Sequence, residues 1–251
     1  MTENLNQTNN EIMNENENEN VNETRPFTWW ERLKYVFVNP VKLFDNLREH
    51  PRVLFPILLV SIGMVLLILL RLDSYKEFLL TKLAQQFAKQ GTEVPNLENL
   101  VNTQLYISII AMAVVPIVVW VFKSFLTNGL ACVFGGDGKF KNAFSVVAHA
   151  YIPILLGQVI ITIISLIIGK FDVLINFAVL LPESMVGGLL YSILAQIDIF
   201  IIWYQILSII GISQVYGIPR KKSALAVLLP WITWILITGG LATLKAAGAA
   251  M

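Results

Sequence analysis

The sequence has little charge and few of the residues that form disulfides or metal centres. Only 14% of its 251 residues are charged, against about 25% in soluble globular proteins, whereas 56% are hydrophobic. A single cysteine, Cys132, excludes an intrachain disulfide, and with two histidines it leaves almost no ligands for a zinc site of the Cys/His type. So few charges cannot coat a soluble surface, and the composition therefore predicts a polytopic membrane protein.

Catalytic signatures are also missing. The sequence has no His-Glu-x-x-His motif, no Gly-x-Ser-x-Gly elbow and no paired intramembrane aspartates. Gly135, Gly136 and Gly138 superficially suggest a phosphate loop, but no Gly-Lys-Ser/Thr follows, and a tight turn explains them because glycine tolerates positive φ. We expect a protein that is not an enzyme, needs no cofactor or metal and binds no nucleic acid.

The N-terminal part of the chain has two sections of different character. Residues 1–25 are a low-complexity Asn/Glu tract with six Glu, which we expect to be a disordered solubilising or recruitment tail without a cleavable signal peptide. Residues 26–52 place Trp29 and Trp30 beside basic residues at helical spacing, with a break at Asn39-Pro40. This pattern predicts an amphipathic interfacial helix in the lipid headgroup zone, or alternatively a cap packed against the helix bundle.

Five apolar segments within residues 53–245 are long enough to cross a bilayer, which takes about 20 residues. We therefore predict an all-α integral membrane fold, a five-helix transmembrane bundle. A hydrophilic stretch after the first span, residues 73–104, is expected to hold a surface helix. The shorter apolar segment 172–182 is expected to be interfacial or re-entrant. The five predicted spans are residues 53–72, 105–127, 144–168, 187–212 and 224–244.

Basic residues are divided unequally between the two sides that five spans define. Twelve lie before the first span and in the loops after the second and fourth, and six lie on the other side. The twelve include Lys123, which we expect to snorkel to the interface. Because loops rich in Lys and Arg stay in the cytoplasm, the N-terminus is predicted to be cytoplasmic and the C-terminus extracytoplasmic, in the cell membrane.

Two polar stripes are predicted on the third and fourth spans. Asp198 is a costly mid-span charge, and Tyr191, Asp198 and Gln205 recur at steps of seven on one helical face. Two interpretations stay open: hydrogen bonds that hold helices together, or a path for ions, protons or lipid headgroups with Asp198 as the titrating group. His149 is expected to be a structural histidine, with a proton relay to Asp198 as the alternative. On the third span the polar residues are Tyr151, Gln158, Thr162 and Ser165.

The ordered motifs resemble the Yip family of five-span membrane proteins, named for interacting with Ypt/Rab-type GTPases, in its bacterial branch. The resemblance covers about residues 27–245 and implies a cytosolic N-terminus, an exoplasmic C-terminus and no known catalysis. Eukaryotic relatives act in vesicle trafficking and membrane shaping, but a GTPase partner does not carry over to bacteria. The motif residues are Asn39, Pro40, Gly135, Gly136, Gly138, Phe140, Pro153, Asp198, Trp203 and Gly211.

The sequence supports two functional hypotheses. The first is a non-enzymatic protein that organises membrane or recruits partners through its N-terminal region and cytoplasmic loops. The second is a translocator of a small solute, an ion or a lipid, built around the polar stripes. The expected partners are the lipid bilayer and other membrane proteins or further copies of the chain.

Overall fold

The computed structural model describes residues 25–91 and 96–248, and the predicted tail over residues 1–25 lies almost wholly outside them. Every regular element in the described residues is helical, which confirms the all-α prediction. Four helical segments are long and apolar enough to cross a membrane: α6 (Leu97–Val133), the α7–α8 pair, α10 (Ile199–Tyr216) and α11 (Arg220–Gly248). A fifth is obtained if α4 (Leu54–Leu69) and α5 (Leu72–Gln90), bent by 71°, form one span.

Two short helices precede the bundle, α2 (Trp29–Val38) and α3 (Pro40–Glu49). Asn39 ends the first and begins the second, because its Oδ1 accepts the Lys42 amide at 3.1 Å. Proline is well suited to the first position of the next helix, since the amide it lacks would be unpaired there. Leu43, Phe44 and Leu47 on α3 are fully buried, so this segment packs on the bundle, as in the second interpretation of residues 26–52. Its place in the headgroup zone stays a prediction.

The third membrane segment is built from α7 (Phe140–Ala150) and α8 (Ile152–Ile168). The fourth differs from the continuous helix expected over residues 187–212, because α9 (Leu189–Leu194) stops before α10 begins. Asp198 causes the new start: its Oδ1 accepts the amides of Phe200 and Ile201 at 2.7 and 2.8 Å. An aspartate in this capping position satisfies amides that have no partner within the helix.

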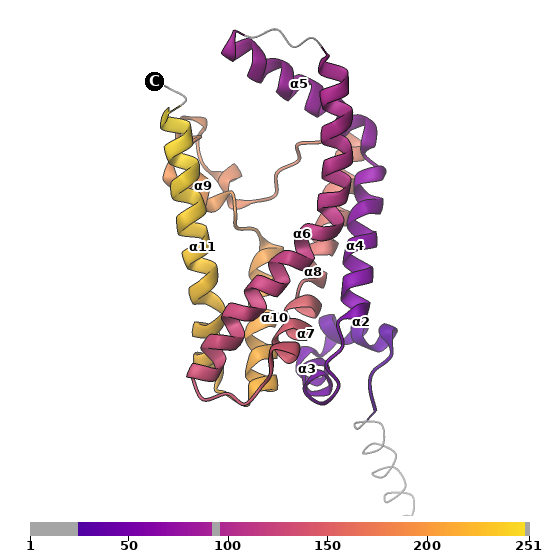
Figure 1. Cartoon of the computed structure of the whole chain (residues 1–251), viewed down its shortest axis with the longest axis vertical. Helices are drawn as coiled ribbons and strands as arrows, with labels where there is room; N and C mark the ends of the chain where they lie inside the picture. The colour runs from indigo at the N-terminus through magenta and orange to yellow at the C-terminus, as the bar shows by residue number, and fades with distance from the viewer. Residues whose placement is uncertain (1–24, 92–95, 249–251) are drawn as a thin grey trace, which may run out of the picture.

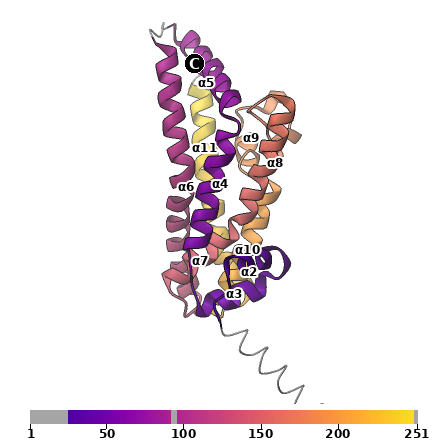
Figure 2. The same cartoon turned by 90° about the vertical axis from the view of Figure 1, so that its right-hand side faces the viewer.

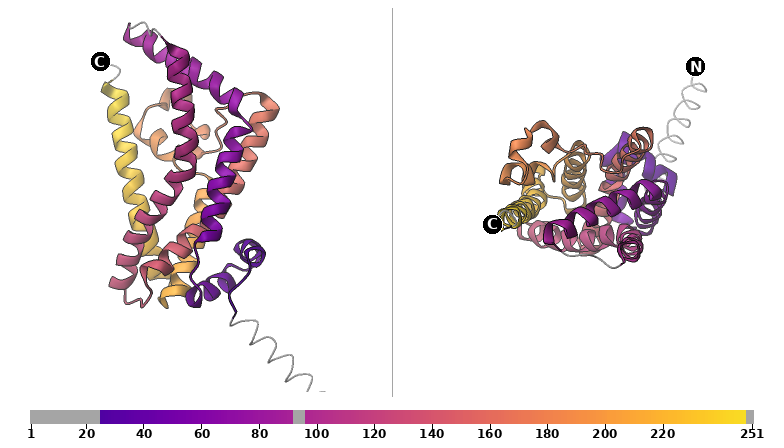
Figure 3. Two further views of the ribbon diagram at one scale, coloured as in Figure 1. Left: turned by 45° about the vertical axis from the view of Figure 1, so that its right-hand side comes forward. Right: turned by 90° about the horizontal axis from the view of Figure 1, so that it is seen from above.

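The segments outside the spans gather at two opposite ends of the molecule. The helices α2 and α3, the α6–α7 turn and the α10–α11 turn lie at the lower end in Figure 1, and α5, α9 and the end of α11 lie at the upper end. Residues 172–182 form no spanning helix: the short 3-10 helix η1 (Phe177–Leu180) lies within them, and η2 (Glu183–Met185) follows them. Figure 2 shows α2 and α3 beside the lower end of α10, and Figure 3 shows α5 lengthwise across the group when seen from above.

Helix α10 is the centre of the bundle and packs against α3, α7, α8 and α11. Gly211 permits the closest approach, because a Cβ built there would lie 2.4 Å from Val146 Cγ1 and 3.0 Å from the Phe44 ring. Both neighbours are fully buried and have no room to retreat. Small residues let helix backbones approach closely where lipid supplies no hydrophobic driving force between helices.

Replacing Gly211 by Ala is predicted to destabilise the protein. We expect a loss of about 1–3 kcal/mol from overpacking, measured as thermal unfolding in detergent. Gly129→Ala on α6 is the matched control, since its new Cβ would meet nothing within 4 Å. The control is expected to be neutral or to gain about 0.5–1 kcal/mol. Equal behaviour of the two variants would contradict close packing at Gly211.

Candidate functional site

The predicted stripe on the fourth span is divided between two helices. Tyr191 lies on α9, Asp198 caps α10, and Gln205 is buried within α10. The three side chains therefore do not share one helical face. On α8, Thr162 Oγ1 donates to the Gln158 carbonyl at 2.8 Å, a bond within the same helix.

Ser165 and His149 also have local partners. Ser165 Oγ donates to the Lys170 carbonyl at 2.6 Å. The fully buried His149 pairs its Nδ1 with the Ser145 carbonyl at 2.8 Å. Such bonds satisfy polar groups in an apolar surrounding without a partner on another helix.

Lys123 has a charged side chain that lies within the bundle. Its Nζ donates to Gln205 Oε1 at 2.8 Å and lies 3.6 Å from the centre of the Tyr204 ring. The expected snorkelling of Lys123 to the interface is not observed, because its Nζ bonds to Gln205 within the bundle and α6 continues past it to Val133. Ten further residues of helix place Lys123 about 15 Å from that end.

Three aromatic rings extend this cluster, which we call the Lys123 cluster (Trp120, Lys123, Tyr151, Tyr204 and Gln205). Tyr151 packs edge-on against Tyr204 at 5.4 Å and against Trp120 at 5.2 Å between ring centres. Contacts of Tyr204 and Lys123 thus link Tyr151 to Gln205, one residue from each predicted stripe. Asp198 is not part of this chain of contacts. In the described part of the chain, Trp120 Nε1 and Tyr204 Oη are buried without a hydrogen-bond partner.

The glycines of the turn between α6 and α7 allow close packing against a neighbouring side chain. A Cβ on Gly136 or Gly138 would lie 2.8 Å from side-chain atoms of Tyr216, and Gly135 has a φ of +90°. Tyr216 Oη donates to Asn128 Oδ1 at 2.6 Å and approaches the Lys139 carbonyl at 3.1 Å. These contacts explain the glycines without a phosphate ligand.

The other motif residues lie at helix ends and contacts. Pro153 lies in the first turn of α8, Phe140 stacks on Phe144 at 6.1 Å, and Trp203 meets Phe37 edge-on at 5.5 Å. Trp29 and Trp30 are 51% and 81% exposed at the start of α2, as an interfacial position requires.

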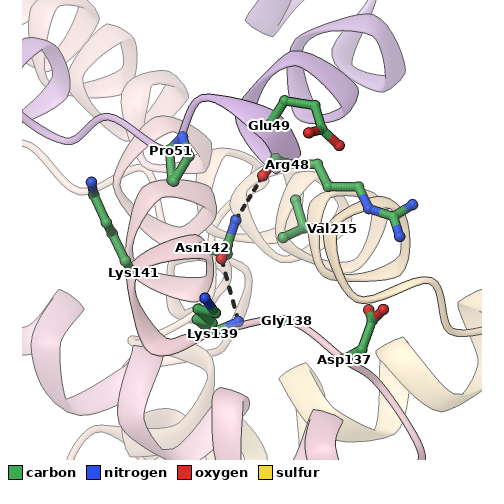
Figure 4. Close-up of a pocket in the computed structure, with 9 residues that line it drawn as sticks. All are labelled: Arg48, Glu49, Pro51, Asp137, Gly138, Lys139, Lys141, Asn142 and Val215. Atoms are coloured by element: carbon green, nitrogen blue, oxygen red, sulfur yellow. Dashed lines mark hydrogen bonds between the residues drawn. The ribbon is translucent and has the colours of Figure 1, made fainter.

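A pocket of about 400 Å³ opens at the lower end of the bundle (Figure 4). Its wall carries three cations, Arg48, Lys139 and Lys141, and two carboxylates, Glu49 and Asp137. Asn142 fixes the wall: its Nδ2 donates to the Arg48 carbonyl at 3.1 Å, and its Oδ1 accepts the Lys139 amide at 3.3 Å. From the sequence alone, these charges predict only the orientation of the protein in the membrane. Their gathering into one pocket could not be predicted, because the segments that carry them lie about 90 residues apart.

Neither polar region resembles a metal centre. Across residues 25–91 and 96–248, no group of three or more His, Cys, Asp or Glu side chains is arranged to hold a metal ion.

Comparison with known proteins gives one match. A family model described as the Yip1 domain matches residues 34–242, which is most of the chain. No curated protein and no solved structure matches. The matched range contains both the Lys123 cluster and the pocket.

Removing the acceptor of Lys123 is predicted to destabilise the bundle. Gln205→Leu leaves a buried ammonium without its hydrogen bond, and we expect a loss of about 1–3 kcal/mol in thermal unfolding. Adding Lys123→Met should recover most of this loss, because the charge is then removed as well. Gln158→Leu on α8 is the control, since its backbone carbonyl still accepts Thr162. Additive effects of the two substitutions would disprove the coupling.

Asp198 is predicted to act as a helix cap and not as a titrating group. Asp198→Asn should keep wild-type stability, because Asn caps as well as Asp, whereas Asp198→Ala should cost about 0.5–2 kcal/mol. Ion flux through liposomes containing the Asn variant should equal that of wild type. A lower flux at unchanged stability would show that the carboxylate charge itself is used.

Proposed function

Because the chain belongs to the Yip1 domain family, as its motifs predict, we propose that it is a non-enzymatic protein that organises membrane or recruits partners. The family and the apolar helices make it a multi-pass membrane protein. The role in recruitment and the choice of the cell membrane are our proposal. A GTPase partner is not part of it.

The charges favour placing the lower end of the bundle in the cytoplasm. With Lys123 inside the bundle, eleven basic residues still belong to the N-terminal region and the two turns at that end, against six elsewhere. The end of α11 lies at the opposite end of the molecule (Figure 1), so the C-terminus is proposed to be extracytoplasmic.

The pocket is the observation that carries the recruitment proposal. It joins α3 to the α6–α7 turn, and the side-chain bonds of Asn142 hold its wall in place before any partner arrives. A preformed surface loses less entropy on binding than a mobile one. Three cations against two carboxylates favour a partner segment that carries acidic groups.

Passage of a small solute, an ion or a lipid is a second candidate function, which one observation favours. The Lys123 cluster places a cation and two unpartnered polar atoms among the described residues deep in the bundle. Polar groups at such depth often mark a pathway. The break before Asp198 and the local bonds on α8 count against a continuous polar path.

Neutralising the pocket is predicted to release cytoplasmic partners. A labelling enzyme fused to the N-terminus would identify neighbours of wild type and of the double variant Arg48→Gln/Lys141→Gln. We expect specific neighbours to fall by about tenfold, the factor that a loss of 1.4 kcal/mol produces.

Lys89→Gln is the matched control for this experiment. Lys89 is exposed on α5 at the opposite end of the molecule, so its neighbours should not change. An unchanged set of neighbours in the double variant, at equal amounts of inserted protein, would refute recruitment through the pocket.

A further inference from the structure

The inner face of α2 carries a charged residue. Arg32 and Val36 lie one turn apart, and each is only 1% exposed. Arg32 therefore points into the protein, although it belongs to a short helix at the end of the bundle. It lies just outside the residues that the family model matches.

The guanidinium of Arg32 presents an unused binding edge. In the part of the chain that the structure describes, its Nε and Nη2 are buried without a hydrogen-bond partner. These two nitrogens lie on the same edge of the planar group, and their N–H bonds point in parallel. This fork matches two oxygens of one phosphate or carboxylate.

Among the described residues, no carboxylate forms an ion pair with Arg32, and only the charge of Glu31 acts on it favourably. The neighbouring Glu31 is taken by Arg25, with 3.0 Å between Nη1 and Oε2, and this hydrogen bond lowers the pKa of Glu31 to about 2. Burial lowers the pKa of Arg32, and the positive charge of Arg52 lowers it further. A buried cation without a counter-charge is costly, so the site favours an anion.

His149 supplies a second unused group beside Arg32. Its Nδ1 is engaged by the Ser145 carbonyl, and its Nε2 is buried without a partner among the described residues. Phe55 links the two regions, with ring centres 5.6 Å from Trp29 and 6.1 Å from His149.

The position of α2 indicates where such an anion comes from. Trp29 and Trp30 are exposed one turn or less before Arg32, and tryptophan prefers the level of the lipid headgroups. Phosphates lie at the same level of a bilayer. We propose that Arg32 and His149 bind a phosphate-type oxyanion, which the headgroup of an anionic phospholipid supplies.

Thermal unfolding of the full chain in a nonionic detergent tests this site. Phosphatidylglycerol is expected to raise the Tm of wild type by roughly 5 °C, and phosphatidylcholine to have little effect. Arg32→Gln should lose this shift. Without lipid, Arg32→Gln should unfold at the same or a higher temperature than wild type, because it removes an uncompensated buried charge.

Two further variants and a second ligand distinguish this site from the pocket and from a site for free phosphate. His149→Phe should reduce the shift, and Arg48→Gln, in the pocket, should keep it. A shift with inorganic phosphate equal to that with phosphatidylglycerol would support the oxyanion site and assign its source to solution. A wild type that responds to neither ligand would overturn the proposal.

The glutamates of residues 1–24 are the competing source of negative charge. A full-length variant with all six changed to Gln should respond to phosphatidylglycerol like wild type. The competing result is that, without lipid, Arg32→Gln lowers the Tm when it is made in the wild-type chain and has no effect when it is made in the six-Gln variant. Arg32 would then pair with the tail, and the lipid site would be refuted.

Discussion

The close approach of α10 to its neighbours is the constraint on which the rest of the structure depends. At Gly211 a hydrogen replaces the methyl group that would collide with Val146 and Phe44. At Gly157 on α8 the same absence makes room for the Phe200 ring, which would lie 2.6 Å from a Cβ. These two contacts bring α3, α7 and α8 against one helix. Dispersion between close surfaces stabilises this arrangement, since burial from lipid contributes little.

The same contacts decide where the polar groups lie. Ser208 on α10 bonds back to the Tyr204 carbonyl at 2.8 Å, and Ser223 on α11 reaches the Ile209 carbonyl at 2.6 Å. Lys123 bonds to Gln205 across the α6–α10 contact because the helices stand close there. The pocket at the lower end follows from the same packing, since it lies where α3 and the glycine turn meet Val215 near the end of α10.

Hydrophobic length predicted the long apolar helices, because it depends on local composition. The break at Asn39-Pro40 was also predictable, since proline restricts its own neighbours. The break before Asp198 could not be predicted. Its flanking residues are apolar, and a single sequence does not distinguish a carboxylate that caps a helix from a charge in the middle of a span. The direction of the Lys123 side chain could not be predicted from the sequence, because Gln205 and Tyr204 come close to it only through the packing of α10.

Lys123 and Arg32, two cations inside the protein, differ in the partners that their surroundings supply. Lys123 is a point charge, and a neutral amide oxygen with an aromatic face provides it with partners inside the protein. Arg32 needs two acceptors side by side, and the described residues offer none to its Nε and Nη2. If folding were the only requirement, an apolar residue at that position would make the bundle more stable, because an unpaired buried charge opposes folding. Arg32 therefore fits the proposed role of a group whose partner comes from outside the folded chain.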